Sequence, residues 1–213
     1  EEIVLAPGAE PAADPNLVLR VAVAAAEFGL PIAPGTLRNL KKCPIGDRNW
    51  TDESRELFIR LLASGPALLN VWEDIDFIDV PGKLIPEGLG VRNRPSASAA
   101  HRYTIDRHMV EVVTRLGRET PSGGRYDDRH YEALLLAGIL HDIGKRPGVA
   151  NHAAEGARHA TVVVERMGFD RDIVRWVTLL VREHLTLSEF ATGRNPNDPN
   201  VGDDLAGRLD HNP

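Results

Sequence analysis

The sequence predicts an all-α protein. Apolar residues recur at helical spacing along most of the chain, and no segment alternates apolar and polar residues as a half-buried strand does. Much of the apolar content is Ala, Leu and Val, while aromatic residues make up only 5% of the 213 residues. A composition of this kind favours helices.

Charge and composition exclude several classes of function. The formal net charge is −6, so no overall basic field attracts nucleic acid or an anionic membrane. No stretch reaches the roughly 20 apolar residues that a membrane span needs. The single cysteine, Cys43, excludes an internal disulfide and fits a reducing compartment. The acidic start EEIVLAPG resembles no signal peptide and lacks a methionine, so we expect a piece of a longer cytoplasmic protein.

Residues 1–95 are expected to form a smaller helical connector region. The helix that begins after Pro15 should end at Gly29, because glycine readily adopts the left-handed conformation of a helix end. Thr51 is the expected N-cap of the next long helix, since its hydroxyl can accept a hydrogen bond from the first turn. Short helices are expected over 67–89, with breaks at Pro81-Gly82 and Pro86.

Residues 96–213 are expected to form a second, more regular helical domain. The polar stretch VRNRPSASA, residues 91–99, has no apolar period and contains the predicted boundary. A last helix is expected to start near Val201. The four main helices are predicted over 104–117, 127–142, 152–168 and 170–186.

The pair His141-Asp142 follows directly after a buried element. Apolar or small residues run without a break from Leu134 to Leu140. Burying a carboxylate at the end of such a run costs free energy unless a partner compensates its charge. A neutral imidazole and a carboxylate match the ligand preferences of a divalent metal such as Mn, Fe or Zn. The sequence therefore predicts that a metal ion binds this pair.

Two further histidines are expected on inward faces of neighbouring helices. His108 lies at the edge of the stripe that Ile105, Met109, Val112, Val113 and Leu116 form, and His184 is expected to face the same way as Ile173, Val177, Leu180 and Val181. Taken singly, each fits a core histidine bonded to a carbonyl better than a metal ligand. His152 opens the helix after the pair, and Asp198 lies in a later loop.

The order of these residues resembles a known family. His108, His141-Asp142 and a distal Asp198 resemble the signature of the HD superfamily of metal-dependent phosphohydrolases, in which HDIGK is a recognisable string. The resemblance extends to the HD domain of the bifunctional PII uridylyltransferase/uridylyl-removing enzymes, and upstream to their central helical region. The strings that carry it are WTDESRELFIRLLAS, LIPEGLGVRNRP, HRYTIDRH, LLLAGILHDIGK, NHAAEGA, VREHLTLS and NPNDPNV.

The resemblance implies a role for each matching residue. It implies an HD-type helical bundle that binds one or two divalent metal ions, with Mn, Fe or Mg as candidates. Lys145 is implied as a phosphate contact or as a residue that supports the ligands. His101 is implied in the phosphate pocket, with a structural role as an equal alternative. The implied metal ligands are His108, His141, Asp142, His152, His184 and Asp198.

The resemblance also implies a function. The expected activity is a metal-dependent phosphodiesterase that removes UMP or AMP from a tyrosine of a PII signalling protein, with neither nucleic acid nor membrane as partner. The sequence contains no Gly-Ser string with paired acids, so we expect removal of nucleotide and not its addition. Two alternatives stay open. One is an HD hydrolase of a free nucleotide, and the other is a non-catalytic regulatory module that binds metal.

Overall fold

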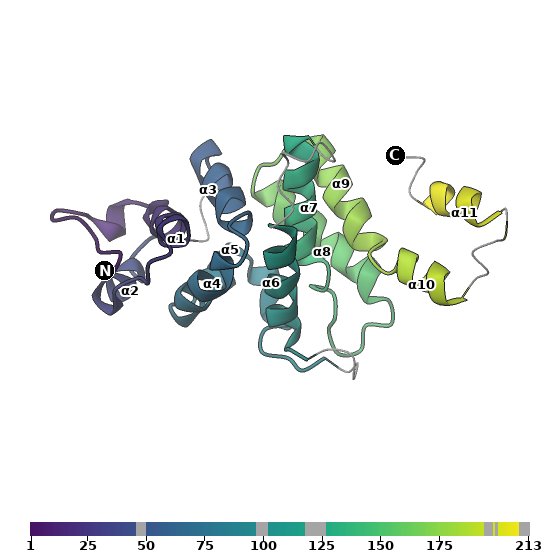
Figure 1. Ribbon diagram of the computed structural model, residues 1–213, viewed down its shortest axis with the longest axis horizontal. Helices are drawn as coiled ribbons and strands as arrows, with labels where there is room; N and C mark the ends of the chain where they lie inside the picture. The colour runs from purple at the N-terminus through teal and green to yellow at the C-terminus, as the bar shows by residue number, and fades with distance from the viewer. Residues whose placement is uncertain (46–49, 97–101, 118–126, 194–197, 199, 209–213) are drawn as a thin grey trace.

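The protein is built from helices, as predicted. The computed structural model describes residues 1–213 except 46–49, 97–101, 118–126, 194–197, 199 and 209–213. Within the described residues, β pairing is limited to two isolated bridges, Ile3–Ile32 and Pro95–Thr104. None of the described helices is long and apolar enough to cross a membrane. Figure 1 shows α1 and α2 at one end of the molecule, α6 to α9 in the middle, and α10 and α11 at the other end.

The first region contains short helices that largely follow the predictions. Gly29 ends α1 with φ 64°, and Thr51 caps α3 through a reciprocal pair of hydrogen bonds with Ser54. The predicted break at Pro81-Gly82 is wrong, because Pro81 lies in the first turn of α5, where a helix needs no N–H donor. The break falls instead at Asp79, which has φ 64°. The elements are η1 (Pro11–Ala13), α1 (Leu17–Phe28), α2 (Pro34–Leu40), α3 (Asp52–Leu62), α4 (Ala67–Phe77), α5 (Val80–Leu84) and η2 (Pro86–Gly90).

The second region contains the longer helices. Each of the four main helices begins within about one residue of its predicted start, and α7, α8 and α9 end earlier than predicted. Leu180 is 38% exposed, so its predicted inward position is wrong, whereas Ile173, Val177 and Val181 are buried. The helices are α6 (Ile105–Leu116), α7 (Asp128–Leu140), α8 (His152–Arg166), α9 (Arg171–Arg182), α10 (Thr186–Gly193) and α11 (Asn200–Arg208).

Helix α7 lies at the centre of the second region. It packs against α6, α8 and α9, and also against α3 of the first region. Its last two turns are buried, as the apolar run predicted, and these residues are Leu135, Leu136, Ala137, Gly138, Ile139 and Leu140. One cluster of buried described residues contains members from both regions. The domain boundary between residues 95 and 96 therefore stays a prediction.

Candidate metal centre

The His-Asp pair lies where α7 ends against α8. His141 is the C-cap of α7, and the Asp142 side chain in the following turn is only 3% exposed. Gly144 continues this turn and lies against the first turn of α8, so close that a Cβ on it would lie 2.2 Å from the His152 carbonyl oxygen. This contact between two backbones brings His152 next to Asp142. The turn thus places a buried carboxylate between the ends of two helices.

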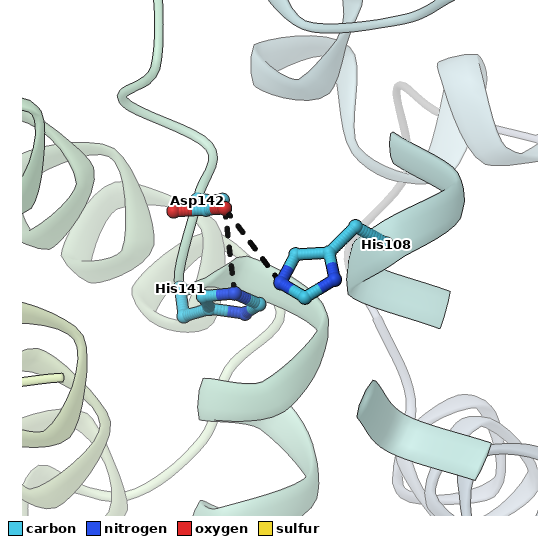
Figure 2. A group of neighbouring side chains, drawn as sticks. All are labelled: His108, His141 and Asp142. Atoms are coloured by element: carbon cyan, nitrogen blue, oxygen red, sulfur yellow. Dashed lines mark ion pairs between the residues drawn. The ribbon is translucent and has the colours of Figure 1, made fainter. Parts of the chain in front are cut away.

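One oxygen of Asp142 faces two histidines and a lysine. Asp142 Oδ2 lies 3.5 Å from His141 Nε2 and 4.0 Å from His108 Nε2, which comes from α6 (Figure 2). Lys145 Nζ donates a hydrogen bond of 2.8 Å to the same oxygen. The imidazoles of His108 and His141 lie edge to face, with centroids 5.2 Å apart. His108, His141 and Asp142 therefore form a first candidate metal group.

The other oxygen of Asp142 faces two more histidines. Asp142 Oδ1 lies 3.5 Å from His184 Nε2 and 3.9 Å from His152 Nε2. His184 follows α9, so side chains of α6, of α8 and of the turns after α7 and α9 meet at the carboxylate. A nitrogen or oxygen ligand atom lies about 2.0–2.2 Å from the ion that it binds. Two ligand atoms of one ion therefore lie at most roughly 4.4 Å apart. The distances from both oxygens of Asp142 to the nearby imidazoles satisfy this limit.

Backbone contacts orient two of the imidazoles. His141 Nδ1 lies 2.9 Å from the Gly138 carbonyl oxygen, and His184 Nδ1 lies 2.7 Å from the Val181 carbonyl oxygen. Because a carbonyl oxygen can only accept, each Nδ1 carries the proton and donates it. In the neutral form of each ring, Nε2 then carries the lone pair, and this atom lies 3.5 Å from an oxygen of Asp142. Such an outer hydrogen bond is the usual way in which proteins orient metal-binding histidines.

The local electrostatics keep three of the candidate ligands in forms that can bind a metal ion. Burial lowers the pKa of His141 to about 4, although the charge of Asp142 opposes this shift. Burial also lowers the pKa of His152. For Asp142, burial favours the protonated form, but the hydrogen-bonded ammonium of Lys145 outweighs burial and holds the pKa well below its usual range. The imidazoles of His141 and His152 are thus neutral, and the carboxylate is ionised, at neutral pH.

The polar atoms at this centre fit a bound cation. Among the described residues, Asp142 Oδ1, His152 Nε2 and His184 Nε2 are buried and make no hydrogen bond. Buried polar atoms without partners are rare and costly in proteins, and one recognised explanation is an ion that binds them. A carboxylate with neutral imidazoles is a donor set suited to a first-row divalent metal. The residues present therefore fit the metal that the sequence implied.

The three remaining predicted site residues are Lys145, Asp198 and His101. Lys145 contacts Asp142 directly, as described above, and is 23% exposed. Asp198 is exposed and outside both metal groups, and its Oδ1 accepts hydrogen bonds from the backbone and side-chain nitrogens of Asn200. His101 lies outside the described residues. The roles of these residues stay predictions.

The sequence interpretation missed the glycines that allow the helices to approach. A Cβ on Gly138 would lie 2.7 Å from Leu116 of α6, and a Cβ on Gly156 would lie 3.4 Å from the His141 carbonyl oxygen. Both glycines interrupt otherwise regular helical patterns, which is the sequence signal for a close backbone approach. Gly144 within HDIGK gives the same signal.

Comparisons with known proteins identify relatives of most of the chain. No family model matches it. The chain is 39% identical over 199 residues to the bifunctional uridylyltransferase/uridylyl-removing enzyme of Mycobacterium tuberculosis (strain H37Rv), which is 93% of the chain and 24% of that enzyme. It is 40% identical over 201 residues to the enzyme of the same name from Streptomyces coelicolor, covering 93% of the chain and 23% of the enzyme. The corresponding match in Corynebacterium glutamicum is 31% identical over 195 residues, covering 90% of the chain and 27% of the enzyme. The chain thus spans about a quarter of the length of these relatives. Nearly all of the chain is homologous to one segment of the bifunctional uridylyltransferase/uridylyl-removing enzymes.

Proposed function

We propose that this chain is a metal-dependent phosphodiesterase that removes a nucleotidyl group from a tyrosine of a PII-type signalling protein. The observation that carries the proposal is the arrangement around Asp142, whose two oxygens each face a separate pair of histidines. The names of the relatives, which include a uridylyl-removing activity, support the substrate class. UMP and AMP are both candidates for the group removed.

The histidines of the centre are proposed to hold cations on the two sides of Asp142. His108 and His141 would hold a cation on one side of Asp142, and His152 and His184 would hold a second one on the other side. When bound, a divalent cation lowers the pKa of a coordinated water and offsets charge on phosphate oxygens. Mn, Fe and Mg are the candidates, and either one or two ions fit this proposal.

Lys145 is proposed to contact the phosphate. Its ammonium lies 2.8 Å from Asp142 Oδ2, so a positive charge is already present at the edge of the centre. A charge at this position stabilises a phosphoryl group that gains negative charge during the reaction. The departing tyrosine phenolate has a conjugate acid with a pKa of about 10, which makes it a fair leaving group without a strong general acid. A role for His101 in the same phosphate pocket stays a proposal.

The test is hydrolysis of a PII protein that carries UMP or AMP on its tyrosine. We expect release of the nucleotide with Mn²⁺, none with a chelator, and none with His141→Ala. The matched control is His130→Ala, because His130 lies at the exposed start of the same helix and should leave release unchanged. Release that persists in His141→Ala would refute the proposed mechanism.

The same assay separates the two alternative functions. Hydrolysis of free nucleotides, with none of nucleotidylylated PII, would assign the centre to a small-molecule hydrolase. Metal bound in stoichiometric amount, with no hydrolysis of either kind of phosphodiester, would assign it to a non-catalytic module. Both results would contradict the proposal.

A further inference from the structure

A cavity separate from the metal centre lies between the two regions of the chain. It has a volume of about 330 Å³ and is lined by residues of α4, α5 and η2 on one side and of α6 and α7 on the other. In Figure 1, α4 and α5 lie next to α6, which lies next to α7. Small-molecule sites typically have volumes of roughly 300–1,000 Å³. None of the candidate metal ligands lines the cavity.

The buried part of the lining is apolar. Val110 and Ile139 are 3% and 4% exposed, and Ile143 is fully buried. Trp72 adds an aromatic side chain that packs against the hydrophobic core. The apolar lining of the cavity includes Leu69, Trp72, Ile85, Met109, Val110 and Ile139. This lining favours a ligand with a large apolar body.

The charged residues of the lining already have partners. Arg92 Nη2 lies 2.9 Å from Asp76 Oδ1, and the Arg107 guanidinium pairs with Glu73. Asp106 accepts a hydrogen bond of 2.8 Å from the backbone N–H of Asn93. An uncharged ligand leaves these pairs intact, and the buried Arg92 Nε, which makes no hydrogen bond to the described residues, stays available to an acceptor atom of such a ligand. The charges thus favour an uncharged occupant.

The cavity lining is continuous along the chain with the metal centre. Met109 directly follows His108, and Ile143 directly follows Asp142. An occupant that displaces either lining side chain would also displace the backbone that carries a candidate metal ligand, because a close-packed interior transmits such shifts. We propose that this cavity binds an uncharged, largely apolar small molecule, and that its occupancy changes the affinity of the Asp142 centre for metal.

The first test measures binding of N-phenyl-1-naphthylamine, an uncharged aromatic dye that fluoresces in apolar sites. We expect saturable binding of one dye per chain, with emission sensitised by excitation of tryptophan. Transfer falls steeply with distance, and of the three tryptophans only Trp72 lines the cavity, so Trp72→Phe should reduce the sensitised emission more than Trp176→Phe does. Binding without saturation, or sensitised emission that falls no more in Trp72→Phe than in Trp176→Phe, would overturn the site.

A second variant fills the cavity. Gly88 lines it, and a Cβ at this position would meet no atom nearer than 3.8 Å, so the backbone has room for a side chain to begin here, as in Gly88→Leu. The matched control is Gly35→Leu in α2, where the nearest atom would lie 3.7 Å away. We expect Gly88→Leu to weaken dye binding at least about tenfold and Gly35→Leu to leave it unchanged. Equal binding by both variants would overturn the site.

The coupling is tested by titrating the protein with Mn²⁺ in the absence and presence of saturating dye. We expect the Mn²⁺ dissociation constant of the unmodified chain to change at least about threefold. In Gly88→Leu the dye should have no such effect. An unchanged dissociation constant in the unmodified chain would overturn the coupling, whatever the dye-binding result.

Discussion

Gly144 and Gly156 bring their backbones into direct contact, because a Cβ on Gly144 would lie 2.3 Å from the Gly156 nitrogen. This contact joins the turn that carries Asp142 to the helix that begins with His152. Gly144→Ala should therefore destabilise the protein by ~3 kcal/mol, at the upper end of the cost of overpacking. Urea unfolding of the variant measures this change.

Two other glycines give matched comparisons. In Gly156→Ala the new Cβ would lie 3.3 Å from its nearest neighbour, so this variant should lose less stability than Gly144→Ala. In Gly193→Ala the new Cβ would meet no atom within 4 Å, so this change should be neutral or slightly stabilising. The expected order of destabilisation is thus Gly144, Gly156, Gly193. Equal stability of the Gly144 and Gly193 variants would contradict the proposed backbone contact.

Asp142→Asn should abolish most of the metal affinity. The amide removes the buried negative charge that both histidine pairs face, so Mn²⁺ binding measured by calorimetry should weaken on the order of 100-fold. Asp198→Asn should have a much smaller effect, because Asp198 contacts Asn200 outside the two metal groups. An equal loss in both variants would show that Asp198 reaches the centre when metal is bound, as the family resemblance implies.

Lys145→Met should separate metal binding from turnover. The variant removes the ammonium from Asp142 Oδ2 but keeps a side chain of similar length. We expect unchanged or tighter Mn²⁺ binding, because a competing positive charge is lost, together with a fall in turnover on the order of 100-fold. Weaker metal binding with unchanged turnover of the metal-loaded protein would show that Lys145 supports the ligands and does not contact phosphate.

The metal-free protein should lose stability as the pH falls from 6.5 to 4. His141 has a pKa of about 4 when folded and an ordinary value of 6.5. Between these values the unfolded chain binds more protons than the folded protein, so the free energy of unfolding decreases as the pH falls. One pKa unit corresponds to about 1.4 kcal/mol, so this histidine accounts for a loss on the order of 3 kcal/mol.

The matched measurement is urea unfolding of the unmodified chain and of His141→Gln, with chelator, at pH 7 and pH 4.5. Glutamine does not titrate in this range, so the variant should lose less stability between the two pH values. His130→Gln serves as the control, because His130 is exposed. Parallel losses in the unmodified chain and in His141→Gln would contradict the low pKa.

Glu87→Gln should loosen the contact between η2 and the elements that carry candidate metal ligands. Glu87 Oε2 lies 2.7 Å from Arg166 Nη2, while the Glu87 carbonyl oxygen accepts a hydrogen bond from Arg146, which follows Lys145. Loss of a charged partner in this half-buried pair should lower the free energy of unfolding by ~1–3 kcal/mol. Glu56→Gln, at a more exposed acid with one 3.8 Å contact, should change it far less. Equal effects would contradict a structural role for Glu87.

Sequence periodicity was sufficient to predict most helices, but not every buried face. The apolar and small residues from Leu134 to Leu140 predicted a buried element, and α7 confirms it from Leu135 to Leu140, because a helix that is apolar on every face is buried. Leu134 is half-buried. Leu180 was predicted to face inward and is 38% exposed. A residue at the edge of an apolar stripe is buried only if a neighbouring helix covers it, and the spacing of one helix contains no information about its neighbours.

The sequence by itself determined that the chain is helical, that His141 and Asp142 end a buried helix, and that a charge at that point needs a partner. These conclusions depend on local spacing and on the cost of burying a carboxylate. Only the tertiary structure decided that one carboxylate faces histidines from three other helices or helix ends, with a different pair on each oxygen. That arrangement depends on how closely backbones approach at Gly138, Gly144 and Gly156, and such contacts join residues too far apart in sequence for any local pattern to specify them.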